Sequence, residues 1–346
     1  MNLDRPLGWA PPDDWRKITV VESHTAGEPF RLVVDGLDPI PGVTMVERRQ
    51  NATERIDDLR RALMWEPRGH ADMYGGIPGP PVEEDSHISV LFLHNEGFST
   101  MCGHGIIALS TIALETGILP METPESTVVI DTPAGQVRSW ASIEDAHVTG
   151  VRFHNVPSFV VGLDRSVDVP GLGAIRYDLA FGGAFYAYVR ADEVGLDLDA
   201  GSAPRLIDAG KRIKASVARA GQLDHPEHAE LGFLYGVIFV GEPSDPTHHS
   251  RNVCVFADGE VDRSPTGTGV SGRLAIERAR DNLEVGERIT IESILGSTFM
   301  GSVVEDIDFA GRPGIIPEVE GRAHITGRSE LWLDPEDSIG EGFLIR

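Results

Sequence analysis

One arrangement occurs twice in the 346-residue sequence: a hydrophobic strand, a turn of small residues, and a glycine-rich start to an Ala-, Ile- and Leu-rich helix. The first copy is "HISVLFLHNEGFSTMCGHGIIALSTIALETG" and the second is "NVCVFADGEVDRSPTGTGVSGRLAIERARD". Such a repeat predicts two similar halves, each directing a helix N-terminus toward a shared cleft. The fold is therefore expected to be paired, with a site between its halves.

The secondary structure predicted around this repeat is mostly β. Short runs rich in Val, Ile, Thr and aromatic residues recur between Gly, Pro, Asp and Asn, which is typical of strands. Helical periodicity is limited to residues 50–65, 104–117, 204–221 and 267–281. This balance predicts an α+β fold and not a regular doubly wound sheet. We expect a first half over residues 1–155, a second half over residues 156–325, and a return of residues 326–346 to the first half.

The charge of the chain excludes several classes of partner. A formal net charge of −24, with no Lys or Arg run to offset it, repels nucleic acid and anionic membranes. The densest apolar run, "LGFLYGVIFVG", is too short to cross a bilayer. The first residues lack the basic and apolar pattern of an export signal, so a cytoplasmic protein without nucleic-acid or membrane partners is expected.

The two cysteines differ in their sequence surroundings. Cys102 lies at the predicted start of a helix in "MCGHG", where free amides and the helix dipole favour a thiolate, so it is a candidate base or nucleophile; the alternative is a small buried hydrophobe. His104 is expected either to orient a substrate or to cap the turn. Cys254 lies in the alternating run "NVCVFAD" and is expected in the core. Neither the cysteines nor the histidines have metal-ligand spacing, so no metal site is predicted.

The second helix start, "DRSPTGTGVSG" at residues 262–272, is a weak nucleotide signal. It lacks the Lys of a phosphate-binding loop and the third Gly of a dinucleotide motif. Free amides at a helix N-terminus bind a small carboxylate as well as a phosphate. Asp262, just before this start, is expected either to form the turn or to hold a substrate ammonium.

Several motifs together resemble the proline racemase family. They are "MCGHG", "DRSPTGTG", "SHTAGEPFR", "PRGHADMYGG", "DTPAG", "FGGAFYA" and the long C-terminal stretch that begins "IIPEVEG". The resemblance covers nearly the whole chain after about residue 17. It implies two pseudo-symmetric α/β halves, each with a curved sheet around a central helix, as in diaminopimelate epimerase and proline racemase.

The resemblance also implies roles for individual residues. Racemases of the family carry a cysteine at each helix start, but here Cys102 is opposed by Thr266. A Thr hydroxyl is not a base near neutral pH, so racemisation with two bases is not expected. Within the family, the Cys and Thr pair resembles that of members that remove water from trans-3-hydroxy-L-proline. Catalytic roles are expected for Cys102 and Thr266, without a cofactor, in a homodimer. Substrate-binding roles are expected for Gly103, His104, Asp262, Gly267 and Thr268.

Other functions remain open from the sequence. A 4-hydroxyproline 2-epimerase or a proline racemase is the alternative within the family, with a water or another residue in place of the second thiol. A non-catalytic imino-acid-binding protein is the alternative from another class. A thiol hydrolase is disfavoured because no His and Asp arrangement is identifiable beside Cys102.

Overall fold

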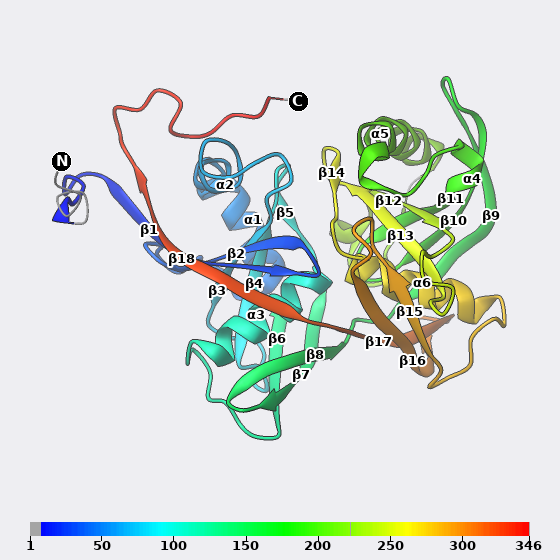
Figure 1. Cartoon of the computed structure of the whole chain (residues 1–346), viewed down its shortest axis with the longest axis horizontal. Coiled ribbons are helices and arrows are strands. Elements are labelled where there is room, and N and C mark those ends of the chain that lie inside the picture. The colour runs from blue at the N-terminus through cyan, green and yellow to red at the C-terminus, as the bar shows by residue number, and fades with distance from the viewer. Residues whose placement is uncertain (1–7, 222, 346) are drawn as a thin grey trace.

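The computed structural model describes residues 8–221 and 223–345, which form two lobes lying side by side (Figure 1). The first lobe contains β1 (Arg16–Thr25), β2 (Glu28–Asp35), α1 (Met45–Arg55), α2 (Asp57–Met64), β3 (Gly75–Gly79), β4 (Ile88–Leu93), β5 (Phe98–Ser99), α3 (Gly103–Glu115), β6 (Glu125–Thr132), β7 (Gly135–Glu144), β8 (His147–His154) and β18 (Ala323–Leu333). The second contains β9 (Phe159–Val169), β10 (Gly173–Phe181), β11 (Phe185–Arg190), α4 (Ala191–Val194), η2 (Ala200–Ser202), α5 (Ala203–Ala220), η3 (Ala229–Leu231), β12 (Leu234–Gly241), β13 (Ser250–Phe256), β14 (Glu260–Val261), α6 (Gly267–Ala279), β15 (Arg288–Glu292), β16 (Thr298–Phe309) and β17 (Arg312–Gly321).

The two lobes have the same strand pairing. In the first lobe β1 pairs with β18 and β2, β2 runs parallel to β3, β3 pairs with β4, and β4 runs parallel to β6. In the second lobe β10 pairs with β9 and β11, β11 runs parallel to β12, β12 pairs with β13, and β13 runs parallel to β15. Each lobe then continues through an antiparallel meander, β6–β7–β8 or β15–β16–β17. The prediction of a pseudo-symmetric α+β fold is confirmed.

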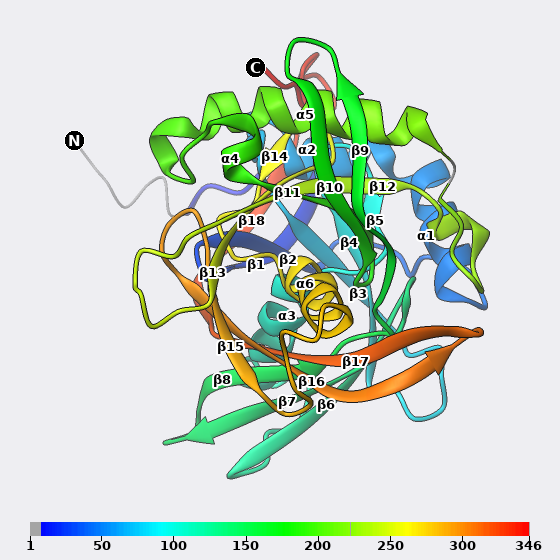
Figure 2. The same cartoon turned by 90° about the vertical axis from the view of Figure 1, so that its right-hand side faces the viewer.

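One helix fills each curved sheet. Nearly all residues of helices α3 and α6 are buried, and α3 is apolar on every side. Helices buried in this way belong in a core, and α3 packs against strands of the first lobe while α6 packs against strands of the second. In Figure 2 both helices lie in the middle of the molecule, and the two are in contact. The starts of these helices are therefore buried between the lobes.

The other predicted helices differ in detail from those observed. The helix expected at residues 50–65 begins earlier, because the Thr44 hydroxyl accepts the N–H of Glu47 and caps α1 at Met45. It is also divided in two, since the backbone of Ile56 leaves the helical region, with φ −136° and ψ 21°. The helix expected at residues 204–221 is α5, which covers one side of the second lobe (Figure 2).

The chain crosses between the lobes twice, after β8 and between β17 and β18. Strand β17 also pairs with β8, so the two sheets meet along this seam. The pairing of β18 with β1 supports the division that we propose, with boundaries near residues 155 and 325. Among the described residues, no helix combines the length and the apolar character needed to cross a membrane.

Candidate active site

The starts of α3 and α6 meet between the lobes. A Cβ atom placed on Gly103 would lie 2.5 Å from Cα of Gly267, so only glycine at these positions allows the two backbones to approach this closely. The first amides of a helix have no acceptor within the helix, and its N-terminus carries a partial positive charge. Two positive helix ends face each other here, which is an arrangement that an anion stabilises.

The predicted site residues line one narrow pocket at this junction. Its cavity volume is about 10 Å³, about that of one water, so the pocket must widen before a ring-sized substrate enters. The lining includes all seven residues that the sequence singled out: Cys102, Gly103, His104, Asp262, Thr266, Gly267 and Thr268. Five further residues line the pocket, and none of them was predicted from the sequence: Met101, Tyr74, Tyr186, Tyr235 and Phe256.

Cys102 is the N-cap of α3. The N–H of Gly105 donates to its Sγ (3.3 Å), and Nδ1 of His104 lies 3.2 Å from the same sulfur. Burial raises the pKa of the Cys102 thiol well above its ordinary value, although hydrogen bonds from Gly105 and Tyr74 lower it. The helix end was expected to favour the thiolate, but in the closed pocket the opposite effects are larger. The pocket removes the thiol from water and sets Asp262 beside it, and both raise the pKa of Cys102.

His104 is neutral in this environment. Burial lowers its pKa to about 3, and its ring donates to the carbonyl of Pro29. A neutral ring with one nitrogen bonded to Pro29 leaves the other to accept the thiol hydrogen of Cys102. The His104 backbone is also fixed, since the Thr25 hydroxyl donates to its carbonyl (2.9 Å). The geometry favours orientation of Cys102 over a simple turn-capping role.

Asp262 and Thr266 form the opposite wall. The hydroxyl of Thr266 donates to Oδ2 of Asp262 (2.7 Å), and the N–H of Ser264 donates to Oδ1 (2.7 Å). Burial raises the pKa of Asp262 to about 6, against the lowering effect of these hydrogen bonds. Asp262 thus forms the turn and also presents a buried carboxylate to the pocket. Cys254 is fully buried in β13, and a hydrogen bond with Thr266 acts on its thiol.

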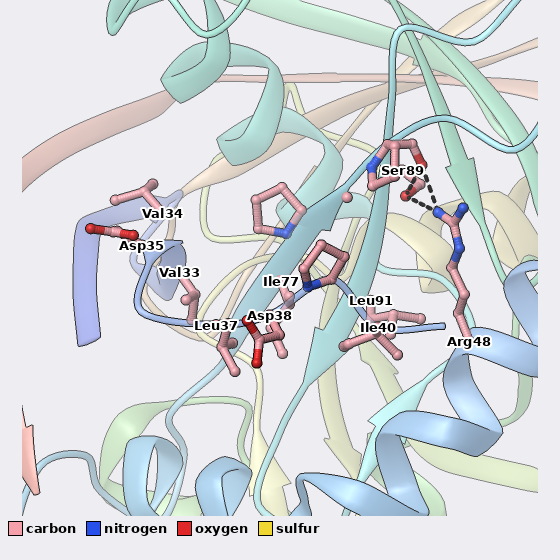
Figure 3. A pocket seen from close by; sticks show the side chains of 14 residues that line it. Val33, Val34, Asp35, Leu37, Asp38, Ile40, Arg48, Ile77, Ser89 and Leu91 are labelled. Atoms are coloured by element: carbon pink, nitrogen blue, oxygen red, sulfur yellow. Dashed lines mark hydrogen bonds between the residues drawn. The ribbon is translucent and has the colours of Figure 1, made fainter. Parts of the chain in front are cut away.

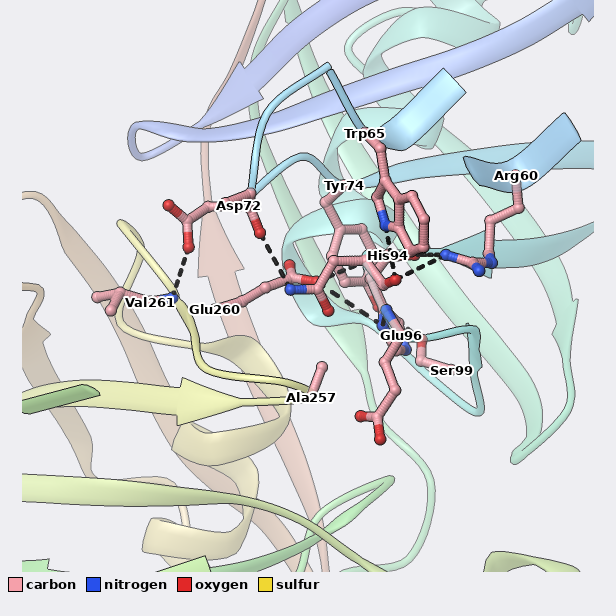
Figure 4. Close-up of polar contacts among 12 residues, drawn as sticks. Arg60, Trp65, Asp72, Tyr74, His94, Glu96, Ser99, Ala257, Glu260 and Val261 are labelled. Atoms are coloured by element: carbon pink, nitrogen blue, oxygen red, sulfur yellow. Dashed lines mark hydrogen bonds and ion pairs between the residues drawn. The ribbon is translucent and has the colours of Figure 1, made fainter. Parts of the chain in front are cut away.

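The loop that carries Asp262 is fastened to the first lobe on both sides. Figure 4 shows part of this contact, with the carboxylate of Asp72 in the first lobe facing the N–H of Val261 in the second. Neighbours of Asp262 are bonded across the lobes while Asp262 itself lines the pocket, so closure of the lobes sets its position. The contacts are Asn95 N–H to Glu260 Oε1 (2.7 Å), Val261 N–H to Asp72 Oδ1 (3.2 Å), Arg263 Nη2 to Asp72 Oδ2 (2.9 Å) and Arg263 N–H to Glu28 Oε2 (2.6 Å).

A larger cavity elsewhere lacks catalytic chemistry. It lies beside β2 and β3 in the first lobe, has a volume of about 180 Å³, and is lined mostly by aliphatic and proline side chains (Figure 3). Its one cation, Arg48, donates to the carbonyl of Pro80 (2.6 Å) and to the hydroxyl of Ser89 (2.9 Å). The described residues contain no cluster of three or more His, Cys, Asp or Glu side chains placed to hold a metal ion.

Comparisons with known proteins identify the family of this site. The family model described as proline racemase matches residues 20–344. This chain belongs to the proline racemase family. One solved structure to which the chain is similar is a hydroxyproline epimerase from Agrobacterium vitis with bound trans-4-hydroxy-L-proline. It is 32% identical, covers 96% of both chains and superposes with a TM-score of 0.91.

Curated relatives within the family carry two different names. The chain is 45% identical to a trans-3-hydroxy-L-proline dehydratase of Colwellia psychrerythraea, over 96% of this chain and 94% of the relative. A human protein of the same name is 41% identical over 95% of each chain. A 3-hydroxyproline 2-epimerase of Burkholderia multivorans is also 45% identical, over 96% of this chain and 99% of the relative.

Proposed function

We propose that this protein is a trans-3-hydroxy-L-proline dehydratase, a hydro-lyase that works without a cofactor. The observation that carries the proposal is the asymmetry of the pocket. A thiol, Cys102, lies on one wall, while the opposing residue is Thr266, whose hydroxyl donates to Asp262. The relatives named as dehydratases support the same reaction. Such a pocket supplies one strong base, which suits a reaction confined to one face of the substrate ring.

The stereochemistry of the substrate matches one base. In trans-3-hydroxy-L-proline the hydroxyl is trans to the carboxylate, so the Cα hydrogen and the hydroxyl lie on the same face of the ring. The carboxylate would bind between the two helix starts, near amides of Gly103, His104, Gly267 and Thr268, where positive helix ends stabilise the charge that develops on it. Asp262 would hold the ring ammonium.

Substrate binding would also activate the thiol. The carboxylate of Asp262 contributes to the raised pKa of Cys102, and pairing of Asp262 with the ring ammonium neutralises that contribution. The Cys102 thiolate then takes the Cα proton, and the resulting thiol protonates the departing hydroxyl on the same face. Water leaves by syn elimination, and the enamine product tautomerises to Δ1-pyrroline-2-carboxylate.

Substitution of the thiol tests this scheme. Cys102→Ser should lower dehydration at least 1000-fold, because a serine hydroxyl is not a base near neutral pH. The assay follows formation of Δ1-pyrroline-2-carboxylate from trans-3-hydroxy-L-proline. Cys254→Ser is the matched control, since this thiol is fully buried in β13 and does not line the pocket, and a serine hydroxyl keeps a polar partner for Thr266. Substantial turnover by a folded Cys102→Ser enzyme would exclude Cys102 as the base.

A 3-hydroxyproline 2-epimerase is the second candidate, because a relative of that name is as similar as the dehydratases. Incubation of trans-3-hydroxy-L-proline in D₂O separates the two reactions: dehydration yields the pyrroline, whereas epimerisation yields a 3-hydroxy-D-proline labelled at Cα.

We further propose that the protein is a homodimer and is cytoplasmic. Light scattering tests the oligomeric state, and cell fractionation tests the location.

A further inference from the structure

Three tyrosines line the pocket, and their hydroxyl groups are engaged differently. Tyr186 is hydrogen-bonded to the hydroxyl of Thr268 (2.8 Å), so it supports the start of α6. Tyr74 comes from the first lobe, just before β3, and Tyr235 comes from β12 of the second. Both are buried, and the nearby Cys102 thiol contributes to the raised pKa of each phenol. Tyr74 and Tyr235 therefore flank Cys102 from opposite lobes.

Tyr74 is held on the side of the pocket that carries the base. Its hydroxyl lies 2.5 Å from Oγ of Ser99. Its ring also packs edge-on against His104, with ring centroids 4.7 Å apart. A hydrogen bond from this phenol lowers the pKa of the Cys102 thiol. Ser99 and His104 thus fix a hydroxyl donor next to the sulfur.

Tyr235 has a buried hydroxyl whose hydrogen-bonding capacity is not satisfied. Its hydroxyl is fully enclosed and makes no hydrogen bond of normal geometry among the described residues, although the Tyr74 hydroxyl lies near enough to lower its pKa. An unmade hydrogen bond on a buried hydroxyl typically costs about 1–3 kcal/mol, so native proteins rarely leave one. The phenol stays protonated, because burial raises the pKa of Tyr235 well above its ordinary value. A ligand hydroxyl placed beside Cys102 would supply the missing partner.

We propose that Tyr74 and Tyr235 form the subsite that holds the departing 3-hydroxyl of the substrate, which rests on the proposed dehydratase function. As the C3–O bond breaks, its electron pair stays on oxygen, and the electrons of the former Cα–H bond form the new double bond. Tyr235 donates a hydrogen bond to the oxygen as its negative charge grows, and Tyr74 donates a second one once the sulfur has taken the Cα proton and no longer needs the Tyr74 hydrogen. The proton on Cys102 then completes the water molecule, so no other reactant is needed.

Binding measurements separate this subsite from the chemistry. In the Cys102→Ser background, calorimetry gives Kd values for trans-3-hydroxy-L-proline and for L-proline, which has the same ring, ammonium and carboxylate without the hydroxyl. Tyr235→Phe should weaken binding of the hydroxylated ligand roughly 10-fold and leave L-proline binding unchanged. Tyr74→Phe should reduce the same preference. In enzyme with Cys102 intact, both substitutions should lower kcat for dehydration.

Tyr188→Phe is the matched control. Tyr188 is equally buried, and its hydroxyl donates to the carbonyl of Gly269 (2.8 Å), but it does not line the pocket. Its loss should leave the ligand preference unchanged. Tyr235→Phe removes an unpartnered hydroxyl and should not lower the unfolding temperature, which keeps the variant measurable. Equal weakening of both ligands, or no change for either, overturns the subsite. A failed dehydratase proposal appears separately, as wild-type enzyme that forms no pyrroline.

Discussion

At the scale of single residues, the hydroxyl of Thr266 is committed to Asp262. Thr266 has φ +68°, an unusual conformation for a β-branched residue, and it persists only where the surroundings impose it. Its hydroxyl hydrogen points at Oδ2 of Asp262, and this hydrogen bond lowers the pKa of that carboxyl. We propose that Thr266 keeps Asp262 ionised for a cationic ligand and does not serve as a second base.

The acid side of the pH profile tests this role. Asp262 must be ionised to hold the ring ammonium, so kcat/KM should fall as the pH drops through about 6. Thr266→Val removes the hydrogen bond that lowers the pKa, so the fall should begin at a higher pH, by about one unit. Thr111→Val is the control, because its hydroxyl donates only locally, to the carbonyl of Ile107 (2.9 Å). If the acid side of the kcat/KM profile of Thr266→Val were not shifted, a group other than Asp262 would control it.

Thr266→Cys tests the opposite wall. A thiol here would place a second candidate base across the pocket from Cys102. The variant should exchange the Cα hydrogen of proline or 4-hydroxyproline on the opposite face, seen as solvent deuterium in the inverted product by mass spectrometry and chiral chromatography. The wild-type protein is the control. A folded variant without exchange would mean that Thr266 is not the main barrier to epimerisation.

Prediction from sequence worked at this scale where a residue type is tied to a local motif. Cys102 was identified because it immediately precedes a glycine-rich helix start, a position that exposes amides, and Thr266 was identified because the family resemblance places it where racemases carry a second cysteine. Tyr235 was missed because it lies in an apolar run, where an aromatic residue ordinarily indicates core packing. Glu28 was missed because its role depends on Arg263, 235 residues away. Contacts that form only when the two lobes close leave no local pattern in the amino-acid sequence.

At the scale of elements, the distance between the starts of α3 and α6 sets the carboxylate site that we propose. Gly103→Ala should push them apart, because the new Cβ would lie 2.5 Å from Cα of Gly267 and neither backbone can yield cheaply. We expect kcat/KM to fall more than 100-fold and the free energy of unfolding to fall by about 1–3 kcal/mol. Gly97→Ala, where a Cβ meets nothing within 4 Å, is the control.

The outcome of Gly103→Ala is read from two measurements together. Denaturant unfolding gives the stability, and steady-state kinetics give kcat/KM for trans-3-hydroxy-L-proline. A variant as active as Gly97→Ala would contradict a carboxylate site that depends on the close approach of the two helices.

Elements themselves were predictable in proportion to their burial. Buried β4, β12 and β13 are dense apolar runs, and each was predicted. Strand β18 escaped detection because most of its residues are exposed and polar, and its pairing with β1 provides its structure. Strand β9 was also missed, because its apolar run is interrupted by Gly162 and by the polar residues Asp164, Arg165 and Ser166, which leave no clear alternation.

At the scale of the whole molecule, Glu28 joins the lobes as a buried acid. It lies at the start of β2, accepts the N–H of Arg263 from the second lobe, and its other oxygen has no partner within the described chain. Burial raises the pKa of Glu28 well above its ordinary value, and the nearby Asp262 adds to the rise. Closure of the lobes thus favours the neutral form of this side chain, and raising the pH opposes closure.

Glu28→Gln tests this linkage through stability. Because the pKa of Glu28 is raised in the folded state, its contribution is fully present below the ordinary value of 4.5 and is lost as the pH rises through the folded-state pKa. Glutamine accepts the same N–H without ionising, so its free energy of unfolding should exceed that of wild type increasingly from pH 5 upward, by at most about 1.4 kcal/mol per pH unit. Urea unfolding between pH 5 and pH 8 measures the difference.

Glu28→Ala is the control. It leaves the Arg263 N–H unpaired and should be less stable than Glu28→Gln at every pH. A difference between Glu28→Gln and wild type that stays constant with pH would mean that Glu28 is ionised in the closed molecule, and that the lobes are joined there by a charge instead of a neutral acid.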